Sequence, residues 1–150
     1  MKKKVLVLVF SIWMVLSGCS DMLENVNDTA TYATKATDYV NEVQTFTNEF
    51  PKLAEQAVSD ATKKADLTKQ LESLQTEISS FNELTAPKIA EDIHKQIEEK
   101  NERISTEINT YLQQVKEGTI DLAKLNEKNG LIDTLQQSIS LINEIKNVTN

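Results

Sequence analysis

The chain has 150 residues, with 16 basic and 23 acidic side chains and a formal net charge of −7. This length fits one domain, and the acidic excess repels phosphate backbones, so we expect no nucleic-acid partner. One cysteine is present, so no disulfide can form within the chain.

The first 18 residues have the organisation of a secretory signal peptide. Lys2, Lys3 and Lys4 form a positive start, and residues 5–16 form an apolar run that only Ser11 interrupts. The run is shorter than the ~20 residues that a helix needs to span a bilayer. We therefore predict cleavage, which removes 18 of the 150 residues and leaves 132. Three lysines leave and all 23 acids stay, so the net charge moves from −7 to −10.

The segment closes with Leu16, Ser17, Gly18 and Cys19, a tetrapeptide that resembles the bacterial lipobox. The resemblance implies recognition of the first three residues by a dedicated signal peptidase and cleavage before Cys19. It also implies an S-diacylglycerol group on the Cys19 thiol, with or without a further N-acyl chain. We expect no metal and no cofactor other than this covalent lipid. Two acyl chains hold a protein durably at a membrane. We therefore expect the mature protein to be anchored at the extracytoplasmic face of the cell membrane.

Residues 19–31 are predicted to be the lipidated N-terminus and a short tether, followed by a helical domain over residues 32–150. An extended stretch of this length reaches about 40 Å at ~3.4 Å per residue. A second reading is that Met22, Leu23 and Val26 already belong to a helix, which shortens the tether.

The first predicted helix carries an apolar seam. Its members alternate at spacings of four and three residues over more than three heptads: Tyr32, Ala36, Tyr39, Val43, Phe46, Phe50, Leu53 and Ala57. Pro51 lies inside this seam. It either kinks one long helix or occupies the first position of a second helix, where its missing N–H costs least.

Three further helices follow. One is predicted near residues 66–84 with Asp66 as its N-cap, one from Pro87 to Glu117 with Gly118 as its stop, and one after the turn at Asn129 and Gly130. The helix predicted from Pro87 to Glu117 carries an apolar stripe: Ile89, Ile93, Ile97, Ile104, Ile108, Tyr111, Leu112 and Val115. The last helix has Asp133 in its first turn, where an acid suits the helix dipole.

Short connections between amphipathic helices favour antiparallel neighbours. We therefore predict an all-α fold, an elongated antiparallel helical bundle of three or four main helices with coiled-coil-like seams. The alternative is a helical hairpin that completes its core as a homodimer.

No motif in the chain indicates an active site. His94 is the single histidine, so we predict that it lies at the border of the core rather than in a catalytic triad or a metal site. Glu98 and Glu102 share a helix face but are expected to be solvated, and acid–base work needs a desolvated site. Phosphate-binding, calcium-binding and hydrolase motifs are absent from the sequence. We predict that the protein is not an enzyme.

Residues 81–87 (Phe-Asn-Glu-Leu-Thr-Ala-Pro) and the following residues 89–94 resemble a family of small uncharacterised lipoproteins from Bacillus-type bacteria, as do residues 36–42 and 57–60. The resemblance extends from the lipobox to the last helix. It implies a Gram-positive source and a lipid anchor, and it implies no activity. Residues 84–87 are interpreted as a bend between helices, with a partner-binding tip as the alternative.

The sequence therefore favours a membrane-anchored, non-enzymatic module that binds a protein or serves an envelope complex. The alternative is a carrier of a small apolar or cationic ligand held between helices, which requires a cavity of a few hundred Å³.

Overall fold

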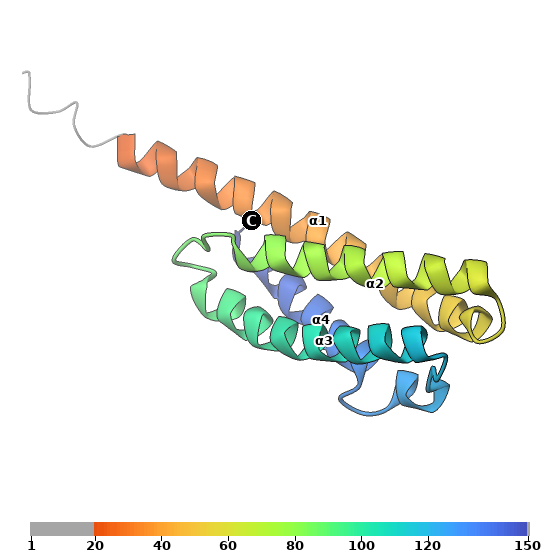
Figure 1. Cartoon of the computed structure of the whole chain (residues 1–150). Coiled ribbons are helices and arrows are strands. Elements are labelled where there is room, and N and C mark those ends of the chain that lie inside the picture. Colours follow the sequence, from red (N-terminus) through yellow and green to blue (C-terminus); the bar gives the residue numbers. More distant parts are fainter. Residues whose placement is uncertain (1–19, 150) are drawn as a thin grey trace, which may run out of the picture.

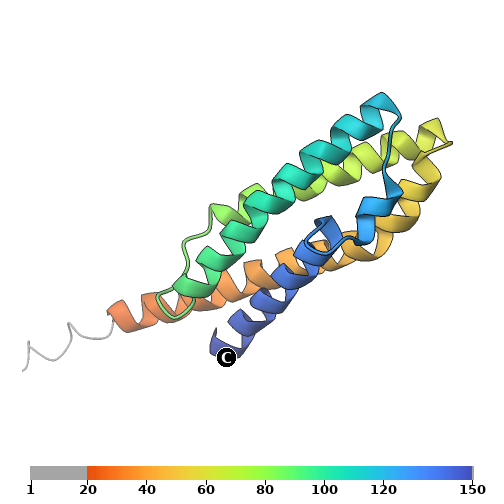
Figure 2. The same ribbon diagram turned by 90° about the horizontal axis from the view of Figure 1, so that it is seen from below.

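The computed structural model describes residues 20–149, so the predicted signal peptide and Cys19 lie outside the described residues. Four α-helices and one short 3-10 helix follow one another: α1 (Ser20–Ala57), α2 (Ala61–Asn82), α3 (Glu91–Glu117), η1 (Leu122–Asn126) and α4 (Leu131–Thr149). Successive α-helices run antiparallel (Figures 1 and 2). The predicted all-α antiparallel bundle is confirmed.

The four helices form a closed ring. Helices α1 and α3 each pack against both α2 and α4, so α1 and α3 stand diagonally across the core. One continuous cluster of buried apolar side chains joins all four helices within a single chain. The bundle therefore closes its core without a second copy, and the predicted alternative of a hairpin completed by dimerisation is not needed.

Helix α1 follows the predicted seam, with Val40 buried in addition and one change near its end. Its seam positions from Tyr32 to Phe50 are buried, but Leu53 is only partly buried and Ala54 is buried instead. A straight helix drifts by about 20° per heptad against a strict seven-residue repeat, so after three heptads the next residue faces the core. Pro51 lies inside α1 and does not begin a new helix.

The N-terminal part of α1 replaces the predicted tether. The helix begins at Ser20, and its first turns project beyond the rest of the bundle (Figures 1 and 2). Residues 20–31 therefore span about 18 Å as a helix, at ~1.5 Å per residue. This is about half the reach of the extended tether.

Two predicted helix starts are wrong. Asp60, not Asp66, caps α2, because its Oδ1 accepts from the backbone N–H groups of Thr62 at 2.7 Å and Lys63 at 3.2 Å. Asp66 lies within the helix and contacts Lys63 at 3.1 Å. The first turn of α2 faces solvent, so no residue of the apolar stripe marks where the helix begins.

Helix α3 begins at Glu91 rather than at Pro87. Residues 87–90 form a separate turn in which the Ala90 N–H donates to the Pro87 carbonyl at 2.8 Å. This turn buries Ala90 and turns Ile89 outward, with 61% of its surface exposed. Ile89 therefore does not belong to the core stripe that the sequence predicts.

Helix α2 ends at Asn82, two residues before the predicted end at Leu84, whereas the boundaries at Gly118 and Asn129 are confirmed. Gly118 ends α3 in the left-handed conformation at φ 73°, and Asn129 takes φ 63° in the turn before α4. The carboxylate of Asp133 lies in the first turn of α4 and accepts from the Asn129 N–H at 2.8 Å.

Candidate functional site

The lipobox residues that the sequence predicts as a site, Leu16, Ser17, Gly18 and Cys19, lie outside the described residues. Helix α1 begins with the residue that follows Cys19. None of the helices within residues 20–149 combines the length and the apolar character needed to cross a membrane.

The loop between α2 and α3, residues 83–90, is called the tip here. It lies at the end of the bundle from which α1 projects, as does the C-terminal end of α4 (Figures 1 and 2). Helix α2 ends with the Glu83 N–H donating to the Ser79 carbonyl and the Leu84 N–H donating to the Phe81 carbonyl, both at 3.1 Å. This places the chain after Leu84 across the end of the bundle, towards α3.

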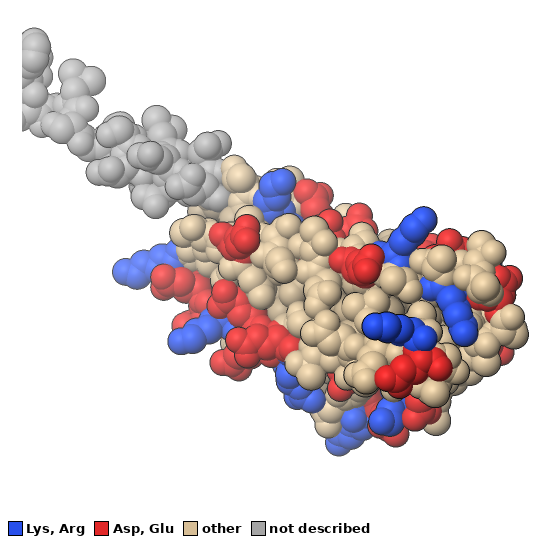
Figure 3. Space-filling view, viewed as in Figure 1, with Lys and Arg blue, Asp and Glu red and all other residues tan. Residues whose placement is uncertain are grey.

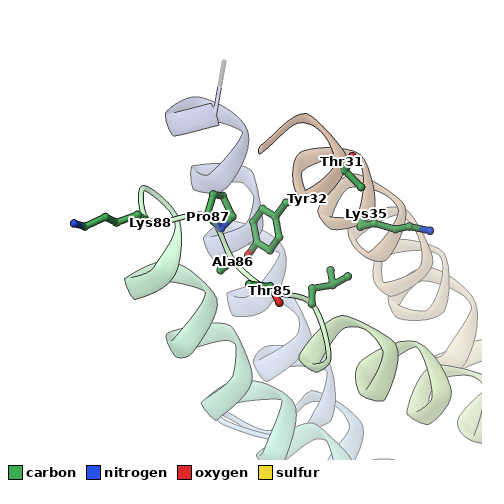
Figure 4. Close-up of a pocket in the computed structure, with 8 residues that line it drawn as sticks. Thr31, Tyr32, Lys35, Thr85, Ala86, Pro87 and Lys88 are labelled. Atoms are coloured by element: carbon green, nitrogen blue, oxygen red, sulfur yellow. The ribbon is translucent and has the colours of Figure 1, made fainter. Parts of the chain in front are cut away.

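A recess of about 560 Å³ lies between the tip and α1. Its lining combines residues of α1 with residues of the tip: Thr31, Tyr32, Lys35, Leu84, Thr85, Ala86, Pro87 and Lys88. Figure 4 shows the rings of Tyr32 and Pro87 side by side, with the Lys35 and Lys88 side chains pointing away in opposite directions. The lysine ammonium groups therefore do not converge on one point of this tip recess.

The tip recess rests on an aromatic cluster. The Tyr32 hydroxyl and His94 Nδ1 lie 2.9 Å apart. The His94 ring centroid is 4.9 Å from that of Phe81, and the Tyr39 ring stacks on Phe81 at 4.5 Å. Since these side chains come from α1, α2 and α3, the cluster joins three helices directly beneath the tip.

His94 is more deeply placed than predicted, with 6% of its surface exposed. Burial lowers the pKa of His94, and the nearby Glu98 carboxylate opposes this. Burial also raises the pKa of Tyr32 well above its usual range, and Glu98 adds to this effect. A protonated Tyr32 hydroxyl donates to Nδ1, which leaves the ring proton on Nε2, 3.7 Å from Glu98 Oε1. The arrangement is that of a neutral histidine that fixes the position of Tyr32.

Charged side chains surround the tip without forming a cation site. In the described part of the chain, no three side chains of His, Cys, Asp or Glu are grouped so that they could hold a metal ion. Glu98 is 40% exposed and Glu102 is exposed, so both remain in contact with solvent. Acidic side chains, interspersed with basic ones, lie near the end from which α1 projects (Figure 3), and Glu91 and Asp92 in the first turn of α3 are exposed.

The sequence predicts His94 near the core but does not reveal its partner, Tyr32. The next core polar residue along α3 is Asn101. It was not predicted as a core residue, yet it is fully buried and accepts a hydrogen bond from the Tyr39 hydroxyl at 2.6 Å. A signal was present, because Asn101 occupies the gap in the apolar series between Ile97 and Ile104. A polar residue at such a gap is either solvated or paired, and periodicity does not distinguish the two.

Comparisons with known proteins agree with the resemblance predicted from the sequence. The model of a family of unknown function, DUF6376, matches residues 32–148. A curated relative, the uncharacterized lipoprotein YybP of Bacillus subtilis (strain 168), is 37% identical over 144 residues, which cover 96% of this chain and 97% of the relative. No solved structure matches the chain. The predicted resemblance to small uncharacterised lipoproteins of Bacillus-type bacteria is confirmed.

Proposed function

Since this chain belongs to DUF6376, a family of unknown function, we propose that it is a lipoprotein held at the extracytoplasmic face of the cell membrane by lipid on Cys19. The name of the Bacillus subtilis relative supports this, as does the order of positive start, apolar run and lipobox over residues 2–19. The lipid supplies the membrane attachment, and helix α1 carries the bundle about 18 Å away from Cys19 at ~1.5 Å per residue.

We further propose that the anchored bundle acts as a non-enzymatic module that binds a protein at the same membrane. The observation that carries this proposal is the tip, which combines the recess of about 560 Å³ with Ile89, 61% exposed and next in sequence to the lining residues Pro87 and Lys88. A single exposed apolar residue is ordinary on a protein surface. An exposed apolar residue beside a recess offers a partner both a side chain to contact and a pocket to fill.

Charge defines the partner's surface. Glu91 and Asp92 are exposed immediately after the tip, and Figure 3 shows acidic side chains interspersed with basic ones at this end of the bundle. The complementary surface has an apolar group that contacts Ile89 and a basic rim that faces the two carboxylates.

Site-specific photo-crosslinking in cells tests this proposal. A photo-reactive amino acid replaces Ile89 in one variant and Val58 in the control, because Val58 is 51% exposed in the turn between α1 and α2, at the other end of the bundle. We expect a reproducible protein adduct from position 89 that is absent from position 58. The adduct weakens when Glu91 and Asp92 are both changed to Lys and disappears with Cys19→Ala. Equal adducts from positions 89 and 58, or none from 89, would refute the proposal.

A second candidate function is the carriage of a small molecule in the tip recess, whose volume lies in the range of ligand pockets. Native mass spectrometry of the purified lipoprotein tests it. We expect one non-covalent ligand per chain, and we expect Thr85→Trp, which fills the recess, to remove it. A wild-type chain that carries no bound mass counts against carriage and leaves the protein-binding proposal intact.

A further inference from the structure

A second recess, of about 290 Å³, lies between α3 and the segment 124–130 that leads into α4. The residues that matter in it are Glu107, Tyr111 and Gln114 of α3, and Lys124, Glu127 and Lys128 of the connecting segment. It lies away from the tip and is called the Tyr111 recess here.

Tyr111 is 2% exposed, yet among the residues that the structure describes its hydroxyl has no hydrogen-bond partner. The tyrosine ring is well held, because Phe50 packs edge-on against it with ring centroids 5.3 Å apart. A buried hydroxyl without a partner is unfavourable, and most such groups in proteins are satisfied. The orphaned hydroxyl therefore points to a group that enters the recess and bonds to it.

Two carboxylates and two lysines line the recess, and carboxylates influence the hydroxyl. Burial raises the pKa of Tyr111 to about 12, and the carboxylates of Glu107, Asp121 and Glu127 add to the increase. The hydroxyl consequently stays protonated and neutral at physiological pH, with an oxygen lone pair that can accept a hydrogen bond. Glu107 is half-buried, whereas Glu127, Lys124 and Lys128 are exposed at the rim.

The connecting segment is tied to α3 beside the recess. The Asp121 N–H donates to Gln114 Oε1 at 3.0 Å, and the side chain of Asp121 caps η1 through the Ala123 N–H at 3.0 Å. Further along the segment, the Glu127 N–H donates to the Lys124 carbonyl at 3.3 Å and the Gly130 N–H donates to the Glu127 carbonyl at 2.9 Å, which hold the backbone of Glu127 in place.

We propose that the Tyr111 recess binds a small organic ammonium ion, which donates to Tyr111 Oη and pairs with the carboxylates of Glu107 and Glu127. At ~30 Å³ per water molecule in the liquid, the recess holds about ten non-hydrogen atoms, the size of a short diamine or triamine. A hard metal ion fits less well, because the described residues bring no three acidic or imidazole groups together and a neutral phenol is a weak ligand.

Calorimetric titration of the detergent-solubilised lipoprotein with cadaverine and with spermidine tests the proposal, and titration with Mg²⁺ is the competing arm. We expect one amine bound per chain, at least tenfold weaker binding in Tyr111→Phe and in Glu107→Gln, and no competition by equimolar Mg²⁺. Tyr111→Phe keeps the ring that packs on Phe50, so its thermal midpoint stays at or above that of the wild type.

Glu99→Gln is the matched control, because Glu99 is an exposed acid on the same helix outside the recess. A diffuse attraction of amines to the acidic surface weakens equally in Glu99→Gln and Glu107→Gln, and this outcome overturns the proposal. Unchanged affinity in Tyr111→Phe, displacement of the amine by Mg²⁺, or no amine binding at millimolar concentration each overturns it as well.

Discussion

The Tyr39 hydroxyl donates to Asn101 Oδ1 at 2.6 Å through the centre of the bundle, joining α1 to α3 across its diagonal. The Asn101 amide in turn donates to Asn82 Oδ1 of α2 at 2.7 Å. One heptad closer to the tip, Tyr32 and His94 repeat the pairing at 2.9 Å. Both pairs are separated by 62 residues in sequence, so a slip of α1 against α3 by one turn would break both pairs together.

Tyr39→Phe tests the contribution of the diagonal bond. The substitution keeps the ring that stacks on Phe81 but leaves Asn101 Oδ1 buried without its donor. We expect a loss of about 1–2 kcal/mol in the free energy of unfolding, measured by urea denaturation followed by circular dichroism. A double-mutant cycle with Asn101→Leu should give a coupling energy of at least about 0.5 kcal/mol. Additive effects would show that the two side chains act independently.

The buried His94 makes stability depend on pH. Burial lowers its pKa in the folded chain, so between that value and the unfolded pKa of about 6.5 the unfolded chain binds more protons. Stability is therefore full above about pH 7 and falls as the pH drops towards 5.5, by at most about 1.4 kcal/mol per pH unit.

Urea midpoints at pH 7.5, 6.5 and 5.5 measure this effect. His94→Gln should be less stable at pH 7.5 but should lack the decrease between pH 7 and 5.5. If wild-type stability instead increased as the pH fell from 7 to 5.5, attraction between a protonated His94 and Glu98 would outweigh the effect of burial.

Asp60→Ala should destabilise the chain by about 1 kcal/mol, because it removes the side chain that caps α2 through two backbone N–H groups. Asp66→Ala is the matched control. It removes only a partly exposed contact with Lys63 and should change the free energy of unfolding by a few tenths of a kcal/mol. Thermal denaturation of the two variants shows which aspartate caps α2. Equal losses of stability in Asp60→Ala and Asp66→Ala would contradict the assignment of Asp60 as the cap.

Gly118→Ala should cost about 1 kcal/mol, because the residue ends α3 at φ 73°. The cost is conformational rather than steric, since an added Cβ would meet only the flexible Lys64 Nζ, at 3.5 Å. Gly118→Asn should cost less, because asparagine tolerates the left-handed region better than alanine. Denaturation midpoints in the order wild type, Asn, Ala would support this reasoning, and an Ala variant as stable as the wild type would refute it.

Cys19→Ala should leave the helical circular dichroism signal unchanged, because the bundle begins after residue 19. The protein should move from the membrane fraction to the medium, since each buried methylene of the lipid contributes about 0.8 kcal/mol to attachment. Mass spectrometry of the wild-type N-terminus should show an acylated Cys19. A wild-type chain without acyl groups, or a variant that stays in the membrane fraction, would contradict lipid anchoring.

Local periodicity was sufficient for much of the fold. The seam from Tyr32 to Phe50, the stop at Gly118 and the turn at Asn129 all follow from residue type and spacing, because they depend on neighbours within one or two helical turns. The start of α2 at Asp60 was mispredicted because its solvent-facing first turn carries no apolar pattern. Ile89 was mispredicted because it continues the four-residue spacing of Ile93 and Ile97, although the turn over residues 87–90 directs it outward.

The sequence by itself determined a helical bundle of antiparallel elements and an acidic chain, and it predicts lipidation at Cys19. Only the tertiary structure decided that His94 pairs with Tyr32, that Asn101 pairs with Tyr39, and that the Tyr111 hydroxyl has no hydrogen-bond partner within residues 20–149. The physical reason is distance along the chain. A polar residue at a core position is unfavourable unless it is hydrogen-bonded. Its partner comes from another helix, whose register is set by the packing of all four helices together.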